Sequence, residues 1–325
     1  MRAAFYEKNG PAREVLQVAE VDTPRPGPGE VRVRLKVSGV NPSDVKAREG
    51  RTRKIAWPRV IPHSDGAGEI DMVGDGVPAA RVGERVWTWN AQWKRAFGTC
   101  ADHVVLPAAL AVPLPAQVSY EAGACLGIPA MTAYHAVAVA GASAGQTVLV
   151  TGGAGGVGHY AIQFAKARSA KVLTTVSSEA KAKLARAAGA DHVIDYKREN
   201  VGERVMAITN KAGVDAVVEM DLAANARLYP DVLHARSTVV VYGTGSAEAQ
   251  IPAQFLLVNA IALKFIYVYE LAAAERAAAI SAITRMLESK TLINNVALTL
   301  PLQDIVAAHE AVEQGKALGN VVVTL

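Results

Sequence analysis

The chain of 325 residues is long enough for two domains, and its composition, 51% hydrophobic and 20% charged, is typical of soluble globular proteins. The formal net charge of +4 is small and no block of five like charges occurs, which argues against a nucleic-acid-binding function. The two cysteines, Cys100 and Cys125, exclude a disulfide framework and a paired-cysteine metal motif. We expect a reducing, cytoplasmic setting, because the first residues also lack the apolar core of a secretory signal.

The first 120 residues contain short strand-like runs at 31–37, 83–88 and 103–106, separated by turn signals rich in proline and glycine. Closely spaced short strands with such turns predict a β-rich, partly closed barrel. We therefore expect a β-rich first domain that ends near residue 122.

From about residue 120 the pattern changes to alternating strands and helices. Residues 122–165 contain no Lys, Arg, Asp or Glu, but glycines and Pro129 interrupt them, so a buried strand–turn–helix fits better than a membrane segment. The predicted helices are 157–168 and 180–188, and the six predicted strands are 148–151, 171–176, 192–194, 214–219, 238–242 and 263–268. This alternation predicts an α/β domain with a doubly wound parallel sheet, the Rossmann arrangement.

The C-terminal segment has a predicted helix at 275–289 and then returns to a strand-like pattern at 298–302 and 321–325. These strands are expected to rejoin the first domain. The predicted domains are therefore a Rossmann domain at 123–267 and a discontinuous β-rich domain formed by 1–122 and 268–325.

A glycine-rich turn follows the first strand of the Rossmann pattern. Gly153, Gly155 and Gly158 have G-x-G-x-x-G spacing between the strand 148–151 and the helix 157–168. Glycine permits a tight turn and close approach of the backbone to a pyrophosphate. The helix N-terminus offers free N–H groups and partial positive charge to the phosphates. The turn therefore predicts a dinucleotide-binding site.

The end of the next strand, 171–176, indicates which dinucleotide binds. NAD sites usually have a carboxylate about twenty residues beyond the glycines, bonded to the ribose 2′-hydroxyl. Here the strand is followed by Ser177 and Ser178, with Lys181 on the next helix. Small donors and a cation suit a 2′-phosphate, so we expect NADP(H). Glu179 lies past the strand end and is the competing acid that would favour NAD(H).

Several motifs along the chain resemble one known family. The run from Gly145-Gln146 to Lys166 fits a quinone-reductase signature at every specified position. Other matching motifs are Gly39-Val-Asn-Pro-Ser-Asp44, Pro62-His-Ser-Asp-Gly-Ala-Gly68, Ile128-Pro-Ala-Met-Thr-Ala-Tyr134 and Gly319-Asn-Val-Val-Val323. On these residues the chain resembles the medium-chain dehydrogenase/reductase superfamily, in its quinone oxidoreductase or zeta-crystallin-like group. The resemblance implies a Rossmann domain and a β-rich, GroES-like catalytic domain.

The resemblance also bears on metal binding. The alcohol-dehydrogenase branch holds a catalytic zinc with a Cys, a His and a second Cys from three segments. The corresponding positions here are Asn41, Ser64 and Ile128, and His63 lies one residue out of register. We therefore expect no metal. Without a Lewis acid, hydride removal from an alcohol is implausible, so quinones and activated alkenes are the expected acceptors.

The same resemblance implies the residues of the cofactor and substrate sites. Asn41 and Asp44 correspond to positions that line the nicotinamide and substrate cleft. The cofactor-binding positions are Thr132, Ala154, Gly155, Gly156, Val157, Ser177, Ser178, Lys181, Tyr196, Asn225, Tyr242, Gly243, Thr244, Ile266, Tyr267 and Asn320.

Two further features concern the substrate cleft. Lys46 stands where zeta-crystallin-like enzymes have a tyrosine. Trp87, Trp89 and Trp93 lie with Phe97 in one short segment, which is expected to form an apolar substrate wall between the domains; core filling is the alternative. A small hydrophobic quinone or conjugated carbonyl is the expected ligand.

Three functions fit the sequence. The first is an NADPH-dependent quinone reductase that transfers hydride or electrons to a small quinone without a metal. The second is an NADPH-dependent reductase of activated C=C bonds in enones or enoyl thioesters. The third is a non-enzymatic role, structural or RNA-binding, as in crystallin-like proteins. We also expect a homodimer, because the apolar edge strand 263–268 would be covered by pairing with its symmetry mate.

Overall fold

The computed structural model describes residues 1–325 and divides them into two compact units. Unit 1 comprises Met1–Pro129 and Ile283–Leu325, and unit 2 comprises Ala130–Ala282. Both divisions fall later in the chain than 122 and 267, where the sequence pattern placed them. The second lies inside the continuous helix α11 (Ala273–Glu288), which has no glycine or proline that would indicate a boundary.

Unit 1 is built on a seven-stranded sheet with the order β14-β15-β3-β4-β5-β7, in which β6 also pairs with β3. From Val31 to Val37, alternate residues of β3 (Glu30–Val40) are buried, which is the period-two pattern of a strand that packs one face on a core. The other strands of this sheet are β4 (Asp65–Val73), β5 (Arg85–Thr88), β6 (His103–Pro107), β7 (Ala111–Pro113), β14 (Val296–Pro301) and β15 (Asn320–Thr324). The prediction that the tail rejoins the first domain is confirmed, because β15 pairs antiparallel with β3.

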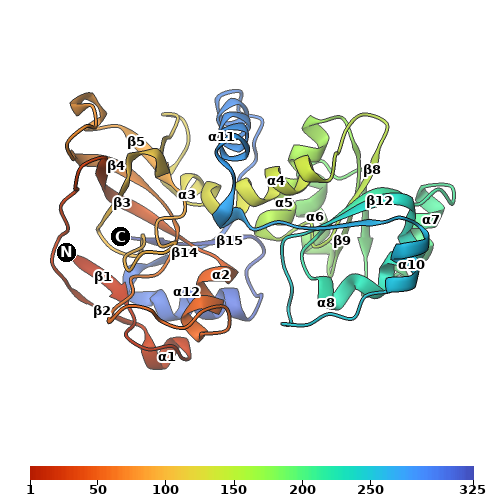
Figure 1. The fold of residues 1–325 in the computed structure, drawn as a ribbon, viewed down its shortest axis with the longest axis horizontal. Coiled ribbons are helices and arrows are strands. Elements are labelled where there is room, and N and C mark those ends of the chain that lie inside the picture. Colours follow the sequence, from red (N-terminus) through yellow and green to blue (C-terminus); the bar gives the residue numbers. More distant parts are fainter. The chain divides into compact units, whose positions relative to one another are not determined.

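The remaining elements of unit 1 are short. A separate ribbon is formed by β1 (Arg2–Phe5) and β2 (Gln17–Glu20). The helices, labelled in Figure 1, are α1 (Ala12–Val15), α2 (Pro42–Glu49), α3 (Tyr120–Gly123) and α12 (Ile305–Glu313). Helix α2 begins at the Asn-Pro motif because proline suits the first helical turn, and it ends at Gly50 in the left-handed conformation.

Unit 2 contains a six-stranded sheet with the order β10-β9-β8-β11-β12-β13, and every pairing in it is parallel. The direction of strand addition reverses between β8 and β11, as in a doubly wound Rossmann sheet. The strands are β8 (Thr147–Val150), β9 (Lys171–Val176), β10 (His192–Asp195), β11 (Val214–Glu219), β12 (Leu233–Val241) and β13 (Ala262–Phe265). The predicted fold class, α/β with a Rossmann sheet and a β-rich unit, is confirmed.

The helices of unit 2 alternate with these strands (Figure 1). They are α4 (Met131–Val139), α5 (Gly156–Ala167), α6 (Glu179–Ala187), α7 (Val201–Ile208), α8 (Leu222–Asn225), α9 (Tyr229–Val232) and α10 (Ala253–Val258), followed by α11. A core cluster that includes Leu149, Leu173, Val217 and Val239 joins the neighbouring strands. The burial of the central strands explains why their sequences are rich in apolar residues.

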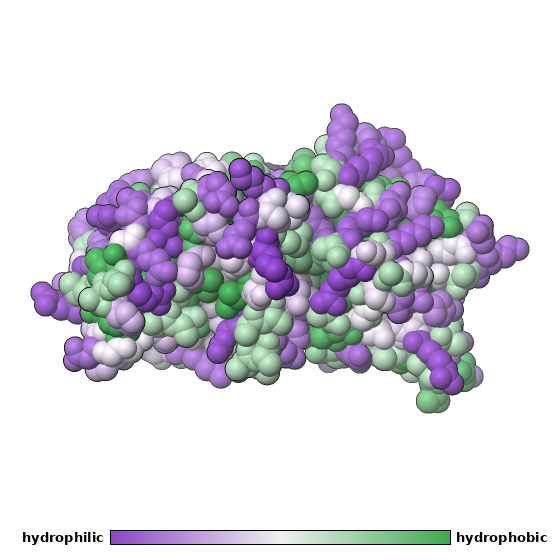
Figure 2. Space-filling model, turned by 90° about the horizontal axis from the view of Figure 1, so that it is seen from above, coloured by the Kyte–Doolittle hydropathy of each residue, from purple (hydrophilic) through white to green (hydrophobic).

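The uncharged segment 122–165 folds as short helical turns, α4, β8 and the first part of α5. None of the helices is both long and apolar enough to cross a membrane. Figure 2 shows hydrophilic side chains spread over the face that it presents, with hydrophobic ones in small groups between them.

Candidate active site

The glycine-rich turn lies between β8 and α5, and two of its glycines are required by close contacts. A Cβ atom on Gly153 would lie 2.1 Å from Thr174 Oγ1, and one on Gly158 would lie 2.3 Å from the Gly152 carbonyl oxygen. Gly155 differs, because a Cβ atom there would meet only the Gly152 carbonyl oxygen, at 3.3 Å. Gly155 is therefore the glycine of the three whose hydrogen faces mostly open space, next to the N-terminus of α5. A phosphate could approach the backbone there.

The carboxyl end of β9 carries the residues predicted to select the cofactor. Lys181 Nζ donates a hydrogen bond to Ser177 Oγ at 3.1 Å, and Ser178 caps α6. The Glu179 carboxylate instead accepts from Arg186 at 2.7 Å, with both side chains exposed on the helix surface. The acid that would favour NAD(H) is thus paired along α6, whereas the lysine lies beside the serine. Tyr196, which follows β10, is 52% exposed.

The carboxyl ends of β8 and β11 meet at Glu219, which the sequence reasoning missed as a site residue. The Glu219 side chain is fully buried and accepts hydrogen bonds from Asn225 Nδ2 at 2.8 Å, the Asp221 backbone N–H at 2.7 Å and the Tyr229 hydroxyl at 3.3 Å. Thr151 Oγ1 lies 3.0 Å from the same carboxylate. Burial raises the pKa of Glu219 above its ordinary value. An acid at the end of an apolar strand was the only available signal.

Beyond the ends of β12 and β13 lies a cavity of about 480 Å³. Its lining includes four residues that the family resemblance assigned to the cofactor: Tyr242, Gly243, Thr244 and Ile266. Tyr267 follows and is 54% exposed. Of the other predicted cofactor residues, Thr132 is buried in α4 of unit 2, and Asn320 begins β15 of unit 1.

In unit 1 the Asp65 carboxylate joins two of the three positions that correspond to zinc ligands, Asn41 and Ile128. Asp65 Oδ2 accepts from Asn41 Nδ2 at 2.7 Å, and both Asp65 oxygens lie 2.9 Å from the Ile128 backbone N–H. Gly127 is needed here, because a Cβ atom on it would lie 2.1 Å from Asp65 Oδ1. Burial raises the pKa of Asp65 well above its ordinary value. The sequence alone did not indicate that Asp65 bridges Asn41 and Ile128.

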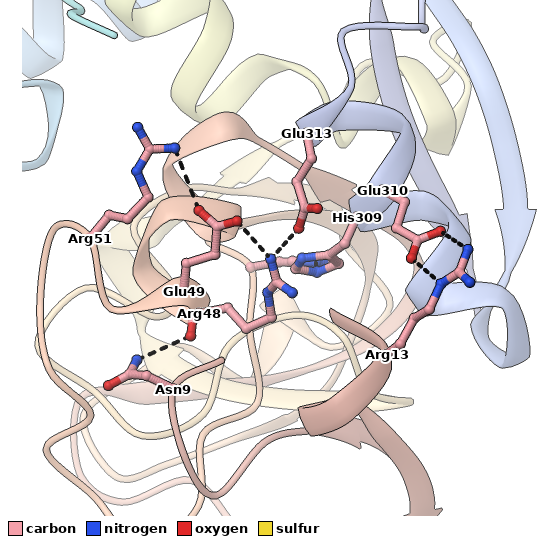
Figure 3. Close-up of polar contacts among 9 residues, drawn as sticks. Asn9, Arg13, Arg48, Glu49, Arg51, His309, Glu310 and Glu313 are labelled. Carbon is pink, nitrogen blue, oxygen red and sulfur yellow. Dashed lines mark hydrogen bonds and ion pairs between the residues drawn. The ribbon is translucent and has the colours of Figure 1, made fainter. Parts of the chain in front are cut away.

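Helix α2 presents Asn41 and Asp44. The Asn41 backbone N–H donates to Asp44 Oδ2 at 2.8 Å, and burial raises the pKa of Asp44 to about 7. The other end of the helix is tied to α12 (Figure 3), where the fully buried Arg48 forms an ion pair with Glu313. Asn9 Nδ2 donates to the Arg48 carbonyl oxygen at 3.1 Å. These contacts fix the helix that carries the two predicted positioning residues.

His63 is committed to a buried chain of hydrogen bonds. Thr99 Oγ1 lies 2.5 Å from the Asp65 carbonyl oxygen, which can only accept, so Thr99 donates there. Ser38 Oγ lies 2.8 Å from Thr99 Oγ1 and 2.8 Å from His63 Nδ1, so Ser38 donates to Thr99 and accepts from His63. The Nε2 atoms of His63 and His309 lie 2.9 Å apart, and His309 is therefore the donor between them. Both imidazoles are neutral, since burial lowers the pKa of each.

The structure changes the interpretation of the aromatic segment 87–97. Trp87, on β5, and Trp89, just after it, are 0% and 2% exposed. They have the burial of core side chains, and a substrate wall could use only Trp93 and Phe97, of which Phe97 is 44% exposed. Lys46 lies on α2 and is partly exposed.

The residues present do not form a zinc site. An amide, a hydroxyl and a hydrocarbon side chain occupy the three corresponding positions, Asn41, Ser64 and Ile128, where zinc would need thiolate and imidazole ligands. No group of three or more His, Cys, Asp or Glu side chains in residues 1–325 is arranged to hold a metal ion.

Comparison with known proteins agrees with both units. A family model described as an alcohol dehydrogenase GroES-like domain matches residues 27–116, and one described as a zinc-binding dehydrogenase matches residues 156–285. The quinone oxidoreductase of Rattus norvegicus is 38% identical over 255 residues, which are 76% of this chain and 75% of that protein. A 2-haloacrylate reductase of a Burkholderia species is 29% identical over 99% of this chain and 98% of its own length.

Among solved structures, the Escherichia coli quinone oxidoreductase complexed with NADPH has a TM-score of 0.89 and 26% identity, with 100% of each chain covered. The relatives in this group are oxidoreductases. The chain therefore belongs to the medium-chain dehydrogenase/reductase superfamily, in its quinone oxidoreductase group.

Proposed function

We propose that the chain is an NADPH-dependent quinone reductase that transfers hydride or electrons from NADPH to a small hydrophobic quinone without a metal. One observation carries this proposal: a dinucleotide-type glycine turn occurs in a chain whose Asn41, Ser64 and Ile128 cannot hold a Lewis-acidic metal ion. An acceptor that takes hydride readily is then required, and quinones do so.

NADPH is the reductant. Its pyrophosphate is held at the turn formed by Ala154, Gly155, Gly156 and Val157, at the N-terminus of α5. Its 2′-phosphate is bound by Ser177, Ser178 and Lys181. The Glu179 carboxylate, which would repel that phosphate, is paired with Arg186. The E. coli structure complexed with NADPH supports this assignment.

Asn41 and Asp44 are the proposed positioning residues, and catalysis rests mainly on orientation of the two reactants. No side chain is needed as an obligatory acid, because the oxyanions of a reduced quinone take protons from water. Trp93, rather than the buried Trp87 or Trp89, is the tryptophan proposed to contact the substrate.

A second candidate is reduction of activated C=C bonds, which the similarity to a 2-haloacrylate reductase favours. The two functions are separated by measuring NADPH oxidation with equal concentrations of 1,4-benzoquinone, a cyclic enone and 2-chloroacrylate. A kcat/KM at least tenfold higher for the quinone supports the proposal. A higher value for either alkene overturns it in favour of the second candidate. A non-enzymatic RNA-binding role instead predicts salt-dependent RNA binding with no NADPH oxidation.

The dimer stays a proposal and rests on one edge of unit 2. Strand β13 is paired only with β12, and Phe265 on it is 67% exposed. Leu257 and Val258 of α10 are 80% and 70% exposed. We propose that a second copy covers this edge. Light scattering should give a dimer for the wild type and for the control Val82→Asp, and a monomer for Phe265→Asp; a monomeric wild type at micromolar concentration contradicts the proposal. The cytoplasmic location also stays a prediction.

A further inference from the structure

We propose that Glu219 is a positioning residue for the cofactor, because it sets the direction of the Asn225 side-chain amide. The inference rests on the proposed function in one respect, namely that a dinucleotide binds at unit 2. Its ligand chemistry is specific: Asn225 would offer a hydrogen-bond acceptor, Oδ1, to an O–H or N–H donor of the bound dinucleotide.

Glu219 lies at the switch point of the parallel sheet of unit 2. Glu219 is the last residue of β11, and Thr151 follows β8, so both lie at carboxyl ends of the two strands between which the order of the sheet reverses. Dinucleotides bind in the crevice outside the carboxyl ends at such a switch point. Thr151 also leads directly into the glycine turn.

The Glu219 carboxylate accepts hydrogen bonds that determine how the Asn225 amide is turned. Glu219 Oε1 accepts from Asn225 Nδ2 at 2.8 Å and from the Asp221 backbone N–H at 2.7 Å. Glu219 Oε2 accepts from Tyr229 at 3.3 Å. A carboxylate can only accept, so the Asn225 amide must turn its nitrogen toward Glu219 and its oxygen away.

The Glu219 and Asn225 side chains differ in their exposure to solvent. Glu219 is fully buried, whereas Asn225 is partly exposed at the end of α8. The nearby Met220 is 44% exposed and packs against the turn, since a Cβ atom on Gly152 would lie 2.1 Å from Met220 Sδ. Asn225 therefore belongs to the rim of the crevice, and Glu219 fixes it from within.

Two conservative variants of Glu219 separate the effect of side-chain length from the effect of charge. Glu219→Gln keeps the length of the side chain: its oxygen can accept from Asn225 and Asp221, while its amide nitrogen can donate to the Tyr229 hydroxyl. Glu219→Asp keeps the charge but is one methylene shorter, so it withdraws from Asn225. Both changes are small enough to retain the fold, which thermal unfolding followed by circular dichroism would check.

The readout is the Kd for NADPH, measured by titration calorimetry. We expect Glu219→Gln to stay within about twofold of the wild type and Glu219→Asp to raise the Kd about 3- to 10-fold, the effect of losing one hydrogen bond between neutral groups. In an Asn225→Ala background, Glu219→Asp should cause no further rise, because the residue through which Glu219 acts is absent. A purely structural role would give the same loss in both backgrounds.

A second titration identifies the donor. Adenosine 2′,5′-bisphosphate contains the adenosine half of the cofactor only. If its Kd is unchanged in Glu219→Asp while that of NADPH rises, the donor is on the nicotinamide half; if both rise, the donor is on the adenosine half. Either pattern supports the proposal.

Three results overturn it: an unchanged NADPH Kd in Glu219→Asp, a loss in Glu219→Gln equal to that in Glu219→Asp, or an equal loss with and without Asn225. A wild type that binds no NADPH overturns both this inference and the proposed function. A wild type that binds NADPH but reduces no quinone overturns only the proposed function.

Discussion

Replacing His63 with asparagine should make unit 1 less sensitive to acid. His63 and His309 are fully buried, and His63 must be neutral because its Nε2 accepts the hydrogen bond from His309 Nε2. The side-chain amide nitrogen of asparagine can replace His63 Nδ1 as the donor to Ser38 Oγ. It also tolerates the backbone φ of 77° at this position, which lies in the left-handed region. The variant therefore removes the titrating group with little change to the backbone.

The size of the effect follows from the pKa. Burial lowers the pKa of His63 from 6.5 to about 3, so between these values the unfolded chain binds a proton that the folded chain does not. His63 therefore contributes stability that is complete above pH 6.5 and is lost as the pH falls toward 3. Linkage gives a loss of about 2 kcal/mol between pH 7 and pH 5. The pKa values of Asp44 and Asp65 are raised and act in the opposite direction, but these groups are present in both proteins.

Urea unfolding followed by tryptophan fluorescence measures this difference, because all four tryptophans lie in unit 1: Trp57, Trp87, Trp89 and Trp93. The fall in unfolding free energy from pH 7 to pH 5 should be about 2 kcal/mol smaller in His63→Asn than in the wild type. His103→Asn is the matched control and should change the fall less, since His103 is partly exposed and lies 3.3 Å from Asp71. Equal falls in His63→Asn and the wild type would refute the reasoning.

Two further predictions concern the cofactor. Lys181→Ala should weaken NADPH binding by about 1.5–3 kcal/mol, the usual value of a hydrogen bond to a charged group, and leave NADH binding unchanged. Lys183→Ala, on the exposed side of α6, is the control. Calorimetric Kd values that rise equally for both cofactors in Lys181→Ala would contradict the assignment. Gly153→Ala should lower the thermal stability of unit 2, because its Cβ would lie 2.1 Å from Thr174 Oγ1. Gly155→Ala should instead fold normally and lose NADPH affinity. A Gly155→Ala protein that binds NADPH as the wild type does would contradict the proposed position of the pyrophosphate.

Local patterns were enough to predict the sheet of unit 2. The run Lys171–Val176 and the run Val214–Glu219 are strands with the predicted bounds, because buried parallel strands are rich in apolar and β-branched residues. The glycine turn was equally accessible, since its spacing and its flanking strand and helix are contiguous in sequence. The predicted strand at 263–268 ends earlier, at Phe265, where pairing with β12 stops.

Contacts between distant residues could not be predicted in this way. His63 and His309 are 246 positions apart, and nothing in either local sequence indicates that they share a hydrogen bond. Trp87 is 0% exposed on β5, and a local cluster of aromatic residues does not reveal whether its members are buried or line a cleft. Glu219 ends a strand that was predicted correctly, but one of its partners, Thr151, lies 68 positions earlier in the chain.

The most direct test of the proposed chemistry is a single turnover in the presence of a strong chelator. Enzyme saturated with NADPH would be mixed with excess 1,4-benzoquinone, and absorbance would follow oxidation of the bound nucleotide while chromatography quantifies the hydroquinone. Metal-free hydride or electron transfer predicts complete oxidation of the bound NADPH, with one hydroquinone formed per NADPH and a rate unaffected by added zinc. Bound NADPH that survives mixing, or oxidation that occurs only after zinc is added, would contradict it.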